Sequence, residues 1–516
     1  MSDITNDQNA TGQVAPATPA AATPAAAPAK PDEFRTVAAD PRPAVPASAS
    51  ARLTWSNNGK TLNYTATAGH LDVREDTGAL LAQMFSIGYV VTNDGAADAQ
   101  RPVTFAFNGG PGSASVPVNI GGIGPIRCKT DGVKHLSRPE IEDNPYTLLQ
   151  QTDLVFLDAP GTGWSTLAEG ADPKKIFGID GDASAFSRAI QDWLEKNNRW
   201  DSPVYLFGES YGTIRNAALM RLLGEQGVYV SGVIMLSAIF DWVQTLPGND
   251  LYYLGMMPTY AATAQFFGKA GTEFDEKTWF DKAMDFADDV LAPALLKGDR
   301  LSAKKEREVA GQLSEFVGLP AEFIAASHLR ISLETFRAKL LEAEGKIAGR
   351  LDTRFSSDAY HPAQSSSEFL ASEDASIDAV DATWNVAFLH FLRDKLGYVA
   401  PSRYLGSNYG TIGVNWDWNH QAAGTEEKVG APNVSFDIAA ALRRSPRTKL
   451  AILGGRYDAA TTYWNVVHDM SAQFFSDEIK ANIEWHLYNC GHMAYVDVPT
   501  LIAMYDDLKA FYAKQA

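Results

Sequence analysis

The chain has 516 residues, of which 45% are hydrophobic and 21% charged, so it is long enough for a large globular core with an insertion. Its 44 Lys and Arg against 62 Asp and Glu give a formal net charge of −18, which argues against binding to nucleic acid or to an anionic membrane. The two cysteines, Cys128 and Cys490, exclude a disulfide framework and a cysteine-based zinc site, and we expect two free thiols.

The first 48 residues are rich in Ala and Pro and begin with an acidic stretch. A secretory signal needs a basic start and an unbroken apolar segment, and this stretch has neither. We therefore expect residues 1–48 to form a disordered tail, with an unusual export segment or a misassigned start as the alternatives. No apolar run reaches the roughly 18 residues of a membrane span, which together with the missing signal favours a cytoplasmic location.

Short β-rich segments alternate with amphipathic helices in the first half of the chain. Strands are expected at residues 61–67, 84–92, 102–108, 153–158, 203–207 and 232–236. Helices are expected at residues 182–196 and from just after residue 212 to residue 223. This alternation predicts a mostly parallel sheet with helices on both faces.

The pattern changes at about Trp242 and returns after about Val434. Between them the chain is helical and rich in loops, and strand patterns reappear at residues 449–454 and 483–488, before a closing helix at 499–512. We therefore expect an α/β core formed by residues 49–241 and 435–516. A helical insertion at residues 242–434 would form a cap on this core.

The pentapeptide Gly208–Gly212 matches the G-x-S-x-G motif, with Ser210 at its centre. Such a serine lies on a sharp turn between a strand and a helix, and the glycines leave room for the strained backbone. Alone the motif is weak, since it also occurs in surface Gly-Ser turns. Here an apolar strand precedes it and a helical pattern follows, so the sequence predicts a nucleophilic serine in an α/β-hydrolase fold.

A serine nucleophile needs a histidine base and a carboxylate that orients the base. In this fold they follow the serine in the order Asp or Glu, then His. Asp458 and His492 each follow a late strand, where loops that face ligands emerge. The remaining histidines fit less well, because they lie within strand or helix patterns or lack a preceding strand: His70, His135, His328, His361, His390, His420, His468 and His486.

An oxyanion hole needs two backbone N–H groups directed at the developing charge. We expect one from Tyr211, which follows the nucleophile, and one from the Gly-rich loop after residues 102–108. A plain Gly-rich turn is the alternative for that loop. The glycine runs lack the G-x-G-x-x-G spacing and a P-loop lysine, so no nucleotide is expected. Neither a metal nor an organic cofactor is implied.

Several ordered blocks of the chain resemble the serine carboxypeptidases, peptidase family S10. The blocks are FNGGPGSAS (107–115), GPIR (124–127), DLVFLDAPGTGWS (153–165), GESYG (208–212), GGRYDAAT (454–461) and NCGHM (489–493). Residues 246–264 further resemble bacterial members. The resemblance implies a hydrolase that removes residues from peptide C-termini through an acyl-enzyme, with a peptide as its partner.

The resemblance also implies individual roles. The triad would be Ser210, Asp458 and His492, and the oxyanion hole would use the N–H groups of Gly110 and Tyr211. The substrate's terminal carboxylate would be bound by Asn108, Gly109 and Glu209. The helical stretch after Trp242 would shape the pocket.

One position departs from the family. Members typically carry a second Glu just before the Gly-Pro of the GPIR block, paired with the Glu beside the nucleophile, and here Gly122 stands there. Two close carboxyls share a proton, which in the family links carboxylate binding to acidic pH. With Glu209 alone we predict a weaker preference for a free C-terminus and a pH optimum nearer neutrality. Arg127 or Arg215 is a candidate substitute clamp, with a structural arginine as the alternative for each.

Three functions remain open from the sequence. The first is the serine carboxypeptidase. The second is an esterase or acyltransferase with the same triad, which the Gly122 departure supports. The third is a non-catalytic binding protein, against which the intact Ser, Asp and His blocks argue. Cys490 beside the histidine block either lines the site or is a packed, inert thiol.

Overall fold

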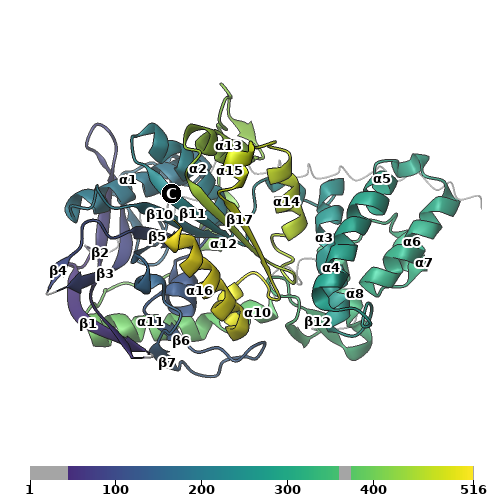
Figure 1. Ribbon diagram of the computed structural model, residues 1–516, viewed down its shortest axis with the longest axis horizontal. Coiled ribbons are helices and arrows are strands. Elements are labelled where there is room, and N and C mark those ends of the chain that lie inside the picture. Colours follow the sequence, from purple (N-terminus) through teal and green to yellow (C-terminus); the bar gives the residue numbers. More distant parts are fainter. Residues whose placement is uncertain (1–44, 58, 94, 360–373, 515–516) are drawn as a thin grey trace, which may run out of the picture. The chain divides into compact units, whose positions relative to one another are not determined.

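The computed structural model describes residues 45–57, 59–93, 95–359 and 374–514 (Figure 1). Most of the expected tail, residues 1–44, lies outside the described residues. Every helix in the described part of the chain is too short or too polar to cross a bilayer.

One eleven-stranded sheet organises the chain. Its main path runs β1 (Ala49–Asn57), β2 (Lys60–Arg74), β3 (Leu80–Asn93), β8 (Asp153–Leu157), β5 (Val103–Phe107), β10 (Val204–Glu209), β11 (Val230–Leu236), β16 (Lys449–Gly455) and β17 (Ile483–Tyr488). The short strands β4 (Ala96–Ala97) and β9 (Thr166–Leu167) pair with β3. The first three strands are antiparallel, β8 runs antiparallel to β3, and the strands from β8 to β17 are parallel.

The parallel strands are where the sequence predicted them. Every residue of β5, β8, β10, β11 and β16 is buried, which explains their continuous apolar runs. The first strands were predicted too short, and β1 was missed. In β1 half-buried and exposed positions alternate, and only Trp55 is fully buried, so polar residues interrupt its apolar signal.

Helices cover both faces of this sheet. Figure 1 shows α1 (Ile179–Lys196), α2 (Tyr211–Glu225) and α13 (Ser435–Arg444) on one side, and α11 (Asp381–Leu396) and α16 (Val498–Ala513) on the other. The buried face of α1 includes Phe186, Ile190 and Trp193, as its helical spacing predicted. This mostly parallel sheet between helices, with a serine turn after β10, is the α/β-hydrolase fold.

A second group of helices has its own hydrophobic core. It comprises α3 (Asp250–Phe266), α4 (Glu276–Phe286), α5 (Ala292–Leu295), α6 (Ala303–Val317), α7 (Ala321–Ala326) and α8 (Leu333–Leu340). Trp279, Val309 and Phe336 are among the buried side chains of this core. By contrast, Trp384 and Phe388 of α11 pack with the sheet. We therefore propose that the expected insertion, residues 242–434, has two parts, of which only the first forms a separate cap.

The remaining elements are short. They are β6 (Ile126–Cys128), β7 (Ile141–Asp143), β12 (Lys346–Ala348), β13 (Ser356–Asp358), β14 (Asn419–His420), β15 (Val429–Gly430), α10 (Ala375–Asp378), α12 (Tyr409–Ile412), α14 (Tyr463–Ser471) and α15 (Asp477–Lys480). A π-helical segment, Pro117–Ile123, follows the glycine-rich loop after β5.

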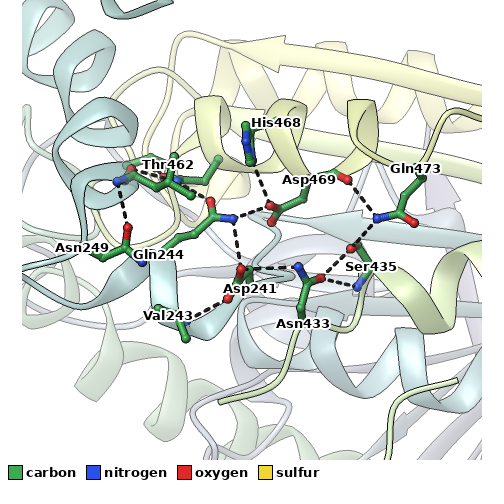
Figure 2. A network of polar contacts seen from close by, with 12 residues as sticks. Asp241, Val243, Gln244, Asn249, Asn433, Ser435, Thr462, His468, Asp469 and Gln473 are labelled. Carbon is green, nitrogen blue, oxygen red and sulfur yellow. Dashed lines mark hydrogen bonds and ion pairs between the residues drawn. The ribbon is translucent and has the colours of Figure 1, made fainter. Parts of the chain in front are cut away.

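A polar network joins the start of the helical group to the sheet domain (Figure 2). Gln244 donates to Asp469 of α14 at 2.5 Å and to Asp241 at 3.3 Å, and its carbonyl oxygen accepts from Asn465 at 2.6 Å. Asn433, just before α13, donates to Asp241 at 3.4 Å. Each of these side chains has a partner, so the network holds three distant segments together without leaving an unsatisfied polar group.

Candidate active site

Ser210 occupies a strained turn between β10 and α2. Its backbone has φ 60° and ψ −130°, a conformation that non-glycine residues rarely adopt. A Cβ atom on Gly208 would lie only 2.2 Å from the Gly212 carbonyl oxygen, so that position requires glycine. The first glycine of the G-x-S-x-G motif is therefore a steric requirement of this turn.

The turn places Ser210 at the carboxyl edge of the parallel strands. Its N–H donates to the carbonyl of Leu236, the last residue of β11, at 3.0 Å. The carbonyl of Ser210 accepts from the N–H of Thr213 at 2.8 Å, and this hydrogen bond forms the first turn of α2. Ser210 is half-buried, while its strand neighbours are fully buried. The geometry thus presents one hydroxyl where a ligand can reach it.

His492 and Asp458 form a buried pair. His492 Nδ1 and Asp458 Oδ2 are 2.8 Å apart, and the two residues are 4% and 0% exposed. The other carboxylate oxygen accepts from the N–H groups of Ala460 at 2.8 Å and Thr461 at 3.0 Å. These donors stabilise the ionised carboxylate, which holds the imidazole in one orientation and leaves Nε2 for other chemistry.

The protonation of His492 follows from this pairing. Burial, the largest influence, lowers its pKa, but the charge and hydrogen bond of Asp458 and the charge of Glu209 outweigh burial, so its pKa is raised. An imidazole in this setting accepts a proton readily and is stabilised when it carries one.

The end of β11 connects the serine to the histidine. Leu236 accepts the N–H of Ser210, and the next residue, Ser237, donates its hydroxyl to the carbonyl of His492 at 2.6 Å. Thr461, three residues after Asp458, donates to the carbonyl of Ser237 at 2.9 Å. The structure therefore brings all three predicted triad residues to the same short stretch of backbone.

The glycine-rich loop after β5 lies directly against the start of α2. A Cβ on Gly109 would lie 2.4 Å from the Tyr211 nitrogen, so only glycine permits this approach. Gly110 is exposed and has φ 109°. The two residues expected to form an oxyanion hole, Gly110 and Tyr211, thus lie on neighbouring segments beside Ser210.

Asp158 fixes the glycine-rich loop through hydrogen bonds to its carboxylate. Its carboxylate accepts from the N–H of Ser115 at 2.8 Å and from the hydroxyl of Tyr404 at 2.8 Å. Burial raises the pKa of Asp158 to about 6, while these two hydrogen bonds oppose that effect. The contacts connect the glycine-rich loop to β8 and to the segment after α11.

Glu209 lies in a closed polar cluster next to the nucleophile. The hydroxyl of Tyr495 donates to Glu209 Oε2 at 2.7 Å, and the two residues are 0% and 2% exposed. Burial raises the pKa of Glu209 to about 7, with the charge of His492 and the Tyr495 hydrogen bond acting in the opposite direction. Asn108 is buried nearby, and its side-chain oxygen accepts from the N–H of Val118 at 3.0 Å.

The Gly122 departure has a structural counterpart in Tyr495. A Cβ on Gly122 would lie 3.1 Å from Cδ1 and 3.2 Å from Cγ of the Tyr495 ring. The ring therefore occupies the space that a side chain at this position would need. No sequence signal linked these residues, because they are more than 300 positions apart and only the fold makes them neighbours.

Both arginines proposed as substitute clamps are already engaged. Arg215 is 0% exposed, donates Nε to Asp182 at 2.7 Å and donates Nη1 to the carbonyl of Asn108 at 2.9 Å. Arg127 is 3% exposed and pairs with Glu142 at 3.4 Å. The structural alternative therefore fits each arginine better than substrate binding.

The two cysteines of the chain are buried thiols. Cys128 and Cys490 are free and buried, and burial raises the pKa of each thiol. The part of the chain described by the structure contains no group of three or more His, Cys, Asp or Glu side chains arranged to hold a metal ion.

His420, set aside in the sequence, is a buried cross-link. Its Nδ1 lies 2.6 Å from Asp180 of α1, and its Nε2 lies 2.9 Å from Asp437 of α13. Burial lowers the pKa of His420, but the two carboxylates outweigh it and raise the pKa to about 9.

The segment of residues 349–355, after β12, was also missed. The Leu351 carbonyl accepts the N–H of His492 at 2.6 Å, and Asp352 accepts the N–H of Gly491 at 3.1 Å. Asp352 also pairs with Arg354 at 2.7 Å. A short irregular segment within a helical region has no periodic pattern, so its role in supporting His492 could not be inferred from sequence.

Known proteins resemble part of this chain. Residues 57–226 match the sequence model of the serine carboxypeptidase family. The chain is 32% identical over 115 residues to serine carboxypeptidase-like 36 of Arabidopsis thaliana, covering 21% of this chain and 22% of that protein. It is 31% identical over 128 residues to the pheromone-processing carboxypeptidase KEX1 of Saccharomyces cerevisiae (strain ATCC 204508 / S288c), covering 23% of this chain and 16% of that protein.

The chain therefore spans about a fifth of the length of these curated relatives. Among solved structures, the peroxisomal α/β-hydrolase Lpx1 of Saccharomyces cerevisiae covers 91% of this chain and 90% of its own at 8% identity, with a TM-score of 0.34. The sequence matches support a relationship to the serine carboxypeptidase family and a hydrolase activity. The resemblance of residues 246–264 to bacterial members lies outside the matched segment and stays a prediction.

Proposed function

We propose that this protein is a serine-type carboxypeptidase that hydrolyses the last peptide bond of its substrates. The observation that carries the proposal is the 2.8 Å pair of His492 and Asp458 at the sheet edge where Ser210 adopts its strained turn. The match of residues 57–226 to serine carboxypeptidases supports the substrate class.

In the proposed first step, His492 Nε2 takes the proton of Ser210 Oγ as the oxygen attacks the scissile carbonyl. Asp458 stabilises the imidazolium that forms, and the N–H groups of Gly110 and Tyr211 stabilise the oxyanion. When the tetrahedral intermediate collapses, His492 returns the proton to the leaving amine, and the acyl group stays on Ser210.

In the second step, water attacks the acyl-enzyme while His492 accepts its proton. The same oxyanion site stabilises the second intermediate. As this intermediate collapses, His492 returns the proton to Ser210 Oγ, and the shortened peptide is released as an acid. No metal or redox partner enters this sequence of steps.

Glu209 gives the proposal a pH dependence. Because burial raises its pKa to about 7, the carboxyl keeps its proton below that pH and can donate a hydrogen bond to a carboxylate. Ionisation above that pH places a negative charge beside the substrate's own. We propose that Asn108, Gly109 and Glu209 contact the terminal carboxylate, and that its binding weakens as pH rises through about 7.

The test uses three matched blocked dipeptides: a free acid, an amide and a methyl ester, at pH 5 and pH 7.5, with Ser210→Ala as the control. Release of the last residue from the free acid, detected by mass spectrometry and absent in Ser210→Ala, is the expected result. Labelling of Ser210 by a fluorophosphonate checks the nucleophile independently. A folded protein that neither labels nor cleaves any of the three would overturn the proposal.

An esterase or acyltransferase is the second candidate. Tyr495 fills the space beside Gly122 and leaves Glu209 as the single carboxyl of the cluster, which favours a site with altered carboxylate recognition. Cleavage of the methyl ester alone, still dependent on Ser210, would make this the better assignment.

A further inference from the structure

The loop of residues 349–352 contacts both loops that carry the histidine pair. The carbonyl of Arg350 accepts the N–H of Ala459, next to Asp458, at 3.2 Å. The carbonyl of Leu351 accepts the N–H of His492 at 2.6 Å. The backbone of Arg350 therefore contacts the residue next to Asp458, and the backbone of the following residue, Leu351, contacts His492.

The backbone of this loop is held by a carboxylate that the arginine side chain does not use. Asp374 accepts the N–H of Leu351 at 2.8 Å and the N–H of Arg350 at 3.3 Å. Its Oδ1 also accepts the hydroxyl of Ser376 at 2.7 Å. With the N–H of Ser376, which donates to the same oxygen at 3.1 Å, these donors orient the Asp374 carboxylate toward backbone and hydroxyl groups.

The Arg350 guanidinium is exposed and, within the described residues, forms no ion pair. The contrast with its neighbours is clear: Arg354 pairs with Asp352 at 2.7 Å, and Arg215 pairs with Asp182 at 2.7 Å. In a chain with a net charge of −18, Arg350 thus places a cation without a protein carboxylate partner next to the candidate site. The positive charge of Arg350 also acts on His492. Burial and the charge of Arg350 both lower the pKa of His492, but the effect of Asp458 is stronger and raises it.

We propose that Arg350 binds the carboxylate of the substrate's C-terminal residue. The inference rests on the proposed function and adds its substrate-recognising cation. A guanidinium matches a carboxylate with two parallel N–H···O bonds and carries the charge that a neutral Glu209 lacks. Of the arginines considered for this role, Arg127 and Arg215 have their guanidinium groups bound by protein carboxylates, and Arg350 does not.

The experiment compares Arg350→Gln and Arg350→Lys with wild type on the free-acid and methyl-ester dipeptides. Arg444→Gln, an exposed arginine at the end of α13, is the matched control. Loss of a charged hydrogen bond should lower the free-acid to ester ratio of kcat/KM by about 10- to 100-fold in Arg350→Gln, chiefly through KM. Arg350→Lys should recover part of this ratio, because lysine keeps the charge but cannot form the two parallel hydrogen bonds of a guanidinium. Arg444→Gln should leave the free-acid to ester ratio unchanged.

Binding provides a second readout that does not need turnover. In a Ser210→Ala background, isothermal titration with the free-acid and amide dipeptides should show tighter binding of the acid, and Arg350→Gln should abolish that difference. An unchanged ratio and unchanged binding in Arg350→Gln would overturn the inference while leaving the hydrolase intact. By contrast, absence of Ser210-dependent cleavage in the wild type would count against the proposed function itself.

Discussion

The two halves of the candidate site are built in different ways. The nucleophile half, comprising the loop after β5 and the turn after β10, comes from adjacent parallel strands and lies within the residues matched by the serine carboxypeptidase family. The histidine half is assembled from Asp458, His492, Tyr495 and the loop at 349–352, all outside that match.

The difference shows which constraints are local. Ser210 needs its glycines because the turn leaves no space for a side chain at position 208, a requirement contained within five residues. His492 depends on Ser237 and Leu351, which belong to separate segments. The serine turn is thus specified by local sterics, whereas the glycine-rich loop beside it and the histidine half depend on tertiary packing.

The largest predicted effect tests whether the halves act as one unit. Ser210→Ala and His492→Ala should each lower kcat by about 10⁶-fold, and the double variant should lose no more than either single variant, by analogy with subtilisin. Steady-state kinetics on the best dipeptide substrate measures this. Losses that multiply would show that the two residues act independently and would contradict the proposed triad.

The sequence predicted some elements of the two halves and missed others. The parallel strands, the serine turn and the loops with Asp458 and His492 lie where the sequence predicted them. The strands before Ser210 and Asp458 are fully buried and give continuous apolar runs, whereas β17 before His492 is mostly half-buried and mixes apolar with polar residues. Strand β1 was missed because its exposed face carries polar residues. Tyr495 and Arg350 were missed because their relation to the site depends on contacts across hundreds of residues.

A smaller effect concerns a cross-link between α1, which lies within the residues matched by the family model, and α13, which lies outside them. His420 bridges Asp180 of α1 and Asp437 of α13, and only the protonated ring can donate to both. Because its pKa is raised to about 9 from an ordinary 6.5, its stabilising contribution is complete below pH 6.5 and is lost as pH rises through about 9.

His420→Asn should therefore lower the free energy of unfolding by about 3 kcal/mol at pH 6, as for removal of one partner of a buried ion pair. The difference in unfolding free energy between wild type and His420→Asn should become smaller at pH 9.5. Urea unfolding at pH 6, 7.5 and 9.5 measures both. A difference in unfolding free energy that stays constant over this range would show that the pKa of His420 is the same in the folded and the unfolded protein, and would contradict this prediction.

The smallest predicted effect concerns Tyr495→Phe, which removes the hydroxyl bound to Glu209 and keeps the ring beside Gly122. That hydrogen bond opposes the burial that raises the Glu209 pKa to about 7, so its loss should raise the pKa further. The high-pH limb of free-acid cleavage should move upward by roughly one unit, for a hydrogen bond worth about 1 kcal/mol.

A pH–rate profile of kcat/KM on the free acid, with the methyl ester as reference, checks this shift. The ester has no terminal carboxylate, so its profile should not follow Glu209. Equal movement of both profiles would show that the limb does not report recognition of the terminal carboxylate by Glu209.

The pairing of β11 with β16 has a consequence for synthesis of the chain. Gly232 to Leu236 pair with Lys449 to Leu453, about 200 residues later. At ~5–20 residues per second, a ribosome needs about 10 to 40 seconds to produce the missing partner strand. Throughout that interval the apolar edge of β11 is unpaired and open to association with other nascent chains. Completion of the sheet therefore depends on protecting this edge until the last part of the chain emerges.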